Sequence, residues 1–171
     1  MISVLSVVHD TMVDGPGFRT SIYCAGCPNH CPECHNPQSW DIKLGTMTST
    51  DDLMKEILSD PFANVTFSGG DPMFQAEGFA ELARAIRKES KKDIWCFTGY
   101  LFENLVKNPQ QLELLKLIDV LVDGPFVKAL RDEDLFFRGS SNQRIINVQK
   151  SLKEGKVVEL HLTKENPNPE L

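Results

Sequence analysis

The chain has 171 residues, of which 41% are hydrophobic and 25% are charged. This length and composition are typical of one globular domain and exclude collagen-like, disordered and coiled-coil proteins. Eighteen Lys and Arg residues against 24 Asp and Glu residues give a net charge of −6, so the sequence lacks the basic footprint of a protein that binds duplex nucleic acid.

Sequence features related to membranes and secretion are also missing. No apolar run approaches the ~20 residues that cross a bilayer, and the first ten residues lack the positive leader and cleavage site of a secretory signal. We therefore expect a cytoplasmic protein. Thiols stay reduced in that compartment, so the five cysteines indicate a metal site rather than a disulfide framework.

Strands and helices are expected to alternate along the chain. Turn formers at 14–17 precede a short strand at 20–23, and residues 27–45 are expected to form a loop because they are rich in Pro, Asn and Gly. Later elements are, in chain order, a helix from about Thr50 capped by Ser49 or Thr50, a strand at 65–67, a helix over 79–86, a strand at 94–97, a helix that starts at Pro109 after the cap Asn108, strands at 120–122 and 144–146, and a short helix before Gly155.

This alternation predicts an α/β fold with mostly parallel strands and helices outside, and by itself it does not separate an open sheet from a barrel. Four expected strands end in polar or glycine-rich loops: the cysteine loop, 68–72, 98–100 and 123–125. In such folds ligands bind beyond the carboxyl ends of the strands, so we expect these loops to share one rim. Residues 1–160 are expected to form a single domain and 161–171 a flexible tail.

Four cysteines, Cys24, Cys27, Cys31 and Cys34, fall within eleven residues. Their spacing alone favours a zinc ion and an iron–sulfur cluster about equally. Cys24 ends an apolar run and is expected to be a core residue, as is Cys96. The other three thiolates would leave one iron of a four-iron cluster without a protein ligand, and an open coordination position is what catalysis needs.

Several motifs together resemble a known superfamily. Cys27-x3-Cys31-x2-Cys34 resembles the signature of radical S-adenosylmethionine enzymes, and Ser68-Gly69-Gly70-Asp71-Pro72 is similar to the glycine-rich motif of that superfamily. The segment Asp14-Gly15-Pro16-Gly17-Phe18-Arg19 resembles one found in glycyl-radical-enzyme activases. Residues 95–100, 122–124 and 138–143 are most similar to activases that act on anaerobic ribonucleotide reductase. The resemblance covers roughly residues 4–143.

The resemblance implies a partial (βα) barrel with a [4Fe-4S] cluster on Cys27, Cys31 and Cys34. Its open iron would bind the amino and carboxylate groups of S-adenosylmethionine, and reductive cleavage would yield a 5′-deoxyadenosyl radical. That radical would take an α-hydrogen from a glycine in the large glycyl-radical subunit of anaerobic ribonucleotide reductase. A one-electron donor such as a flavodoxin or ferredoxin is implied as a second partner.

Particular residues carry these implied roles. Asp14 and Arg19 are expected to contact the partner protein, and Glu33 stands where the superfamily often has an aromatic residue. The residues expected around S-adenosylmethionine are Glu33, Cys34, His35, Gly69, Gly70, Asp71, Thr98 and Asp123. Two alternatives stay open: an activase of another glycyl-radical enzyme of the formate-lyase type, and a Cys₄ zinc-binding interaction module without catalysis.

Overall fold

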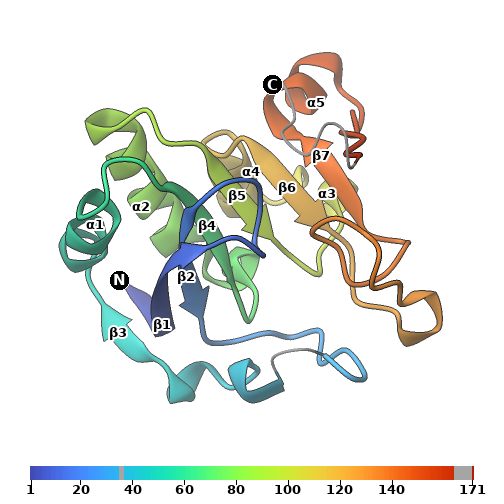
Figure 1. The fold of residues 1–171 in the computed structure, drawn as a ribbon, viewed down its shortest axis with the longest axis horizontal. Coiled ribbons are helices and arrows are strands. Elements are labelled where there is room, and N and C mark those ends of the chain that lie inside the picture. Colours follow the sequence, from blue (N-terminus) through green and yellow to red (C-terminus); the bar gives the residue numbers. More distant parts are fainter. Residues whose placement is uncertain (35–36, 164–170) are drawn as a thin grey trace.

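The computed structural model describes residues 1–34, 37–163 and 171 (Figure 1). Seven strands form one sheet in the order β3-β1-β2-β4-β5-β6-β7. The strands are β1 (Ile2–Thr11), β2 (Arg19–Cys24), β3 (Thr46–Thr48), β4 (Asn64–Gly69), β5 (Ile94–Phe97), β6 (Val120–Asp123) and β7 (Arg144–Asn147). The α-helices are α1 (Thr50–Leu58), α2 (Ala76–Glu89), α3 (Phe102–Leu105), α4 (Pro109–Leu115) and α5 (Val148–Glu154). None of the described helices has the length and apolarity needed to cross a membrane.

The α/β class is confirmed, but the sheet is mixed rather than mostly parallel. The central strands β2, β4, β5 and β6 are parallel to one another, whereas β1 runs antiparallel to both β2 and β3, and β7 runs antiparallel to β6. Parallel neighbours need a long crossover connection, and antiparallel neighbours do not. The strand pairs β1–β2 and β6–β7 have no α-helix between them in the chain, so the chain reverses direction at each of these pairs.

The helix ends follow the expected capping chemistry. The Ser49 hydroxyl accepts a hydrogen bond from the Asp52 N–H at the start of α1, and the Asn108 side chain caps α4, where Pro109 takes the first position. Gly155 ends α5 with φ +71°, in the left-handed region that glycine adopts at low cost. These three predictions are confirmed.

The sheet buries a different apolar layer on each face, because successive residues of a strand point to opposite sides. On one face, where α1, α2 and α4 pack side by side (Figure 1), the core is built from residues such as Ile22, Phe67 and Leu121. On the other face a smaller cluster contains Trp95, Val120, Val122 and Ile145. No α-helix supplies residues to this second cluster in the described part of the chain, and the loop residue Phe137 packs against it instead.

The C-terminal segment around Leu160 and Leu162 also packs against this second face of the sheet. The Leu160 N–H donates to the Ile145 carbonyl at 2.7 Å, and both Leu160 and Leu162 pack against the second cluster. Leu162 belongs to the segment 161–171 that the sequence predicts to be a flexible tail. The remainder of that prediction, at 164–170, lies outside the described residues.

Candidate active site at the carboxyl ends of the parallel strands

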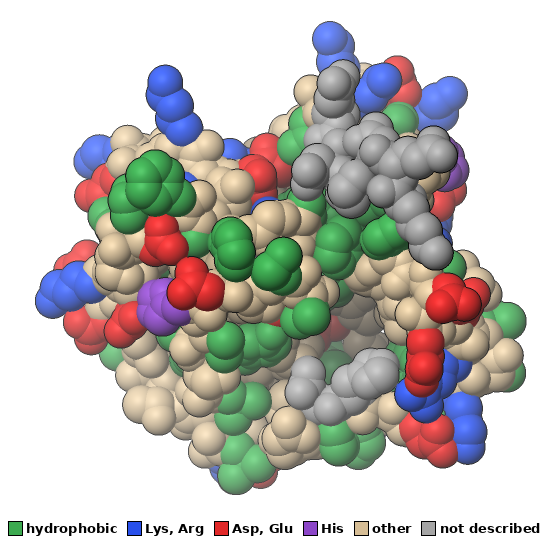
Figure 2. Space-filling model, viewed as in Figure 1, with side chains coloured by type: hydrophobic (Ala, Val, Ile, Leu, Met, Phe, Trp, Pro, Cys, Tyr) green, Lys and Arg blue, Asp and Glu red, His purple; other side chains and the backbone are tan. Residues whose placement is uncertain are grey.

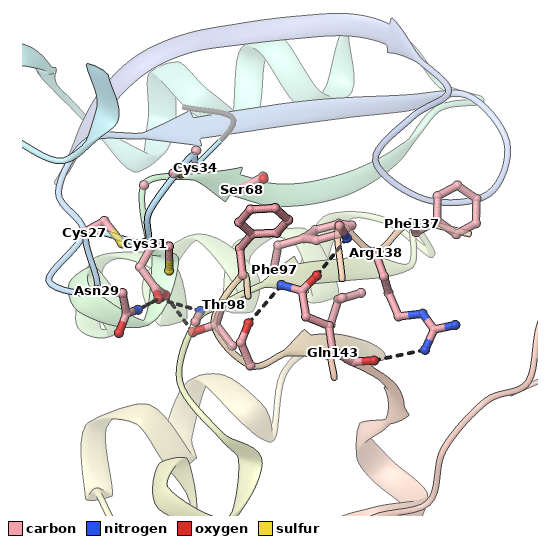
Figure 3. Close-up of a pocket in the computed structure, with 18 of the residues that line it drawn as sticks. Cys27, Asn29, Cys31, Cys34, Ser68, Phe97, Thr98, Phe137, Arg138 and Gln143 are labelled. Atoms are coloured by element: carbon pink, nitrogen blue, oxygen red, sulfur yellow. Dashed lines mark hydrogen bonds between the residues drawn. The ribbon is translucent and has the colours of Figure 1, made fainter. Parts of the chain in front are cut away.

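A cavity of about 530 Å³ opens where the central strands end (Figure 3). In Figure 2 it forms a recess right of centre, with hydrophobic side chains gathered beside its mouth. Residues from all four expected rim loops line it, which confirms their convergence on one edge of the sheet. The wall is completed by the loop between β1 and β2 and by the loop between β6 and β7, through Val13, Asp14, Phe126, Leu135, Phe137, Arg138, Gly139 and Gln143.

Cys27, Cys31 and Cys34 all line this cavity. Backbone hydrogen bonds anchor the start of their loop: the Gly26 N–H donates to the Ser39 carbonyl at 2.7 Å and the Cys27 N–H to the Trp40 carbonyl at 3.1 Å. Burial raises the pKa of the Cys27 thiol, and the backbone of Asn29 and His30 partly opposes that shift.

The donor set of this loop fits an iron–sulfur cluster. The described His, Cys, Asp and Glu residues do not already converge in threes on a metal position. However, three cysteines line one cavity that also has room for a small molecule, and thiolate sulfur is the ligand that iron–sulfur clusters require. Cys27, Cys31 and Cys34 are therefore the residues that would hold a cluster.

Gly69 and Gly70 bring backbone into the cavity wall where a side chain would not fit. Gly69 has φ +104°, and a Cβ at this position would lie 2.4 Å from the Cys24 nitrogen. A Cβ on Gly70 would lie 2.4 Å from the Gly26 carbonyl oxygen, because the end of β4 crosses the base of the cysteine loop there. Both positions need glycine, and the exposed backbone is available to a ligand.

Asp71 is fully buried and joins three segments of the rim. Its Oδ1 accepts hydrogen bonds from the Thr98 hydroxyl at 2.7 Å and the Met73 N–H at 3.0 Å, and its Oδ2 accepts from the Gly99 N–H at 2.8 Å and the Asn29 amide at 3.2 Å. Burial nevertheless raises the pKa of Asp71 to about 6. Asp71 therefore ties the cysteine loop to the end of β5.

Asp123 does not lie where the sequence predicts. Val122 and Gly124 line the cavity, but the fully buried Asp123 carboxylate accepts from the Phe102 N–H at 2.9 Å and from the Arg144 guanidinium at 2.6 and 3.0 Å. The hydrogen bonds that the Arg144 guanidinium donates to Glu103 and Asp123 raise the pKa of Arg144. The carboxylate of Asp123 thus helps to hold α3 and β7 together and does not reach the cavity wall.

Glu33 and His35 are the other two residues of the cysteine loop that the sequence predicts to contact the cofactor. Glu33 is exposed, has φ +56° and forms an ion pair with Lys128, and it is not among the residues that line the cavity. His35 lies outside the described residues. Nearby, His30 stacks on Trp40 with ring centroids 4.6 Å apart and is not among the residues that line the cavity.

The two residues expected to contact the partner protein, Asp14 and Arg19, lie in different environments. Asp14 lines the cavity, and its carboxylate accepts from the hydroxyls of Thr11, Ser21 and Tyr23. Arg19, in contrast, is fully buried at the amino end of β2, where it binds the Thr66 hydroxyl and pairs with Asp93. Arg19 has no surface to offer a partner, so that prediction is corrected: the side chain is a core residue.

Cys24 and Cys96 are fully buried, which confirms the expected core positions, and burial raises the pKa of both thiols. The sequence analysis did not single out Asn29, which follows Cys27 by two residues, nor Phe97 and Phe137, which form apolar wall. For Asn29 the available signal was its position between two candidate ligands. For the aromatic residues no signal separated a cavity wall from ordinary core.

The comparisons with known proteins agree with this geometry. A family model described as a 4Fe-4S single cluster domain matches residues 13–146. The chain is 37% identical over 140 residues to the anaerobic ribonucleoside-triphosphate reductase-activating protein of Escherichia coli strain K12, which covers 77% of this chain and 90% of that protein. Proteins of the same name from Enterobacteria phage T4 and Haemophilus influenzae are 35% and 34% identical, over 78% of this chain and 86% and 90% of theirs. The chain belongs to the family of anaerobic ribonucleoside-triphosphate reductase-activating proteins.

Proposed function

We propose that this protein is a radical S-adenosylmethionine enzyme that activates an anaerobic ribonucleoside-triphosphate reductase. The observation that carries the proposal is the meeting of Cys27, Cys31 and Cys34 with the backbone of Gly69 and Gly70 around one cavity. The names and the cluster domain of the relatives support the reductase as partner and the cluster as cofactor.

Three cysteines would hold a [4Fe-4S] cluster and leave one iron open to S-adenosylmethionine. Such a cluster would supply the chemistry of reductive S-adenosylmethionine cleavage, which would yield methionine and a 5′-deoxyadenosyl radical able to take an α-hydrogen from a glycine of the reductase. We further propose that the parallel strands β2, β4, β5 and β6 correspond to the partial barrel of this superfamily, with antiparallel strands added at both edges.

The protein residues would bind, orient and shield these groups. The backbone carbonyls at Gly69 and Gly70 would accept hydrogen bonds from the methionyl ammonium group, since the Gly70 N–H already donates to the Cys24 carbonyl. Asp71 and Thr98 would hold that wall and the cysteine loop in register through their mutual hydrogen bond. The apolar walls at Phe97, Val122 and Phe137 would exclude water from a reactive radical.

Two protein partners belong to this proposal. The large glycyl-radical subunit would present its glycine at the mouth of the cavity, beside Asp14. A flavodoxin or ferredoxin would deliver one electron at a time to the cluster. A cytoplasmic location, where thiols stay reduced, fits the three cysteine ligands.

Separate alanine substitutions of the cysteines test the proposal. Cys27→Ala, Cys31→Ala and Cys34→Ala should each abolish S-adenosylmethionine cleavage, and the purified wild-type protein should contain about four irons per chain. Cys24→Ala is the matched control, because Cys24 lies at the same end of the sheet with its side chain fully buried in the core. It should retain most of the iron and most of the cleavage, measured anaerobically.

The same experiment identifies the competing explanations. One zinc per chain and no cleavage would contradict the proposal, as would a Cys24→Ala variant that loses iron as completely as the other three. Electron paramagnetic resonance of the reductase then tests the partner: a glycyl radical should form on it. Radical formation on a formate-lyase-type enzyme in its place would keep the chemistry and replace the partner.

A further inference from the structure

Arg138 differs from every other arginine of the chain. Of the six arginines, five form an ion pair with a carboxylate, namely Arg19, Arg84, Arg87, Arg131 and Arg144. Within the described residues Arg138 has no carboxylate partner, and its Nε is buried without a hydrogen-bond acceptor. An unpaired guanidinium is costly to hold where it is partly buried, and in the described part of the chain Arg138 lacks the counter-ion that each of the other five arginines has.

The loop around Arg138 is built to hold the guanidinium still. Arg138 Nη1 donates to the Gln143 carbonyl at 3.0 Å. The Gln143 side chain in turn accepts from the N–H groups of Gly139 and Ser140 and donates to the Gly124 carbonyl at 2.9 Å, at the end of β6. Because Nη1 is occupied and Nε is buried, Nη2 is the donor of the guanidinium that remains to bind a carboxylate.

The neighbouring residue shows that this loop conformation is maintained at a cost. Phe137 has φ +54°, in the left-handed region that bulky residues rarely adopt. Its ring packs edge-on against Trp95, with centroids 5.4 Å apart. Backbone strain of this kind persists only where the surrounding structure fixes it, and it is concentrated at binding sites.

No carboxylate of the cavity itself is available to Arg138. Two carboxylates line the described cavity, Asp14 and Asp71. Asp14 accepts from three hydroxyl groups, and Asp71 accepts from Asn29, Met73, Thr98 and Gly99. The missing counter-ion therefore has to arrive with a ligand.

We infer that Arg138 binds a carboxylate of the polypeptide that enters the cavity, an acidic side chain or a chain terminus of the reductase. This inference rests on the proposed function. The cofactor's own carboxylate would bind the open iron next to the cysteines, and Figure 3 shows Arg138 at the opposite end of the cavity from Cys27 and Cys31. The carboxylate at Arg138 therefore belongs to the partner protein.

Direct binding of the cluster-loaded protein to the reductase subunit, in the presence of S-adenosylmethionine, tests this inference. Arg138→Gln should raise the Kd by about tenfold or more, the loss typical of one charge-assisted hydrogen bond. Arg138→Lys keeps the charge but not the planar fork and should give an intermediate Kd. Arg131→Gln is the matched control, because Arg131 lies in the same loop but is exposed and pairs with Glu133; its Kd should equal that of the wild type.

Two further measurements separate the possible failures. Equal Kd values for Arg138→Gln and Arg131→Gln, with both variants folded by circular dichroism, would overturn the inference. It would also be overturned if Arg138→Gln weakened binding of S-adenosylmethionine, measured by equilibrium dialysis, and left reductase binding intact. The proposed function fails by a different readout, namely the absence of a glycyl radical on the reductase with the wild-type protein.

Discussion

Asp71 is the residue on which most of the cavity wall depends. A buried carboxylate without a cationic partner persists only when hydrogen bonds replace the lost water. Asp71 meets that condition through four donors, one of which, Asn29, belongs to the cysteine loop. We conclude that the side chain acts as a brace between segments, whereas the sequence alone suggested a direct contact with the cofactor.

Removing the Asn29 side chain should loosen the cysteine loop without unfolding the protein. Asn29→Ala deletes the hydrogen bond to Asp71 and should cost about 1 kcal/mol of stability. We expect faster amide exchange in residues 27–34 of the metal-free protein and less iron per chain after reconstitution. Asn108→Ala, which removes the α4 cap at a similar cost, should leave both quantities unchanged; equal iron loss in the two variants would contradict the brace.

The raised pKa of Asp71 predicts a pH dependence of stability. Its pKa is about 6 in the folded chain against an ordinary 3.8, so the folded state binds this proton more tightly than the unfolded state. The stability that the protonated group contributes is present below pH 4 and is lost as the pH rises through 6. The free energy of unfolding relative to Asp71→Asn should therefore fall between about pH 4 and pH 7, by at most about 3 kcal/mol.

Urea titrations of the metal-free protein and of Asp71→Asn at several pH values measure this difference. A difference that stays constant over the range would show that folding leaves the pKa of Asp71 unchanged, and one that grows with rising pH would show that folding lowers it; either result would contradict the prediction.

At the scale of elements, local sequence signals identified the central strands, the helices α1, α2 and α4, and the caps of α1 and α4. They did not identify β1 or β3. The strand β3 has only three residues, two of them exposed, and depends on its pairing with β1. The shared rim was predictable, since parallel strands end on one edge. The burial of Arg19 could have been predicted from the alternation of side chains along β2. Ile22 and Cys24 face one core, so Arg19 points to the opposite face of the sheet.

The contact between the end of β4 and the cysteine loop gives a prediction for an element junction. Gly70→Ala would place a Cβ 2.4 Å from the Gly26 carbonyl oxygen, so one segment has to move at a cost of about 1–3 kcal/mol. We expect reduced iron binding together with a lower melting temperature. Gly155→Ala is the control: nothing lies within 4 Å of its Cβ position, so it should lower stability by the left-handed backbone strain alone and should not alter iron content.

Over the whole molecule, the cavity collects residues from Val13 to Gln143, so most of the chain contributes to one wall or another. A ligand that binds only the folded state stabilises it by mass action and protects the elements that it touches. Loading the cluster and S-adenosylmethionine should therefore slow amide exchange simultaneously in three distant segments, 24–27, 69–71 and 97–99. Protection confined to the cysteine loop would contradict a cofactor that spans the strand ends.

The stacked rings of His30 and Trp40 have a practical consequence. The indole lies beside the cysteine loop, while the other tryptophan, Trp95, is buried in the second apolar cluster beside Arg19. An iron–sulfur chromophore entering the loop would quench the fluorescence of the nearer indole more strongly. The unlabelled chain thus contains an optical probe and an internal reference, through which the kinetics of cofactor insertion can be followed in a stopped-flow cell.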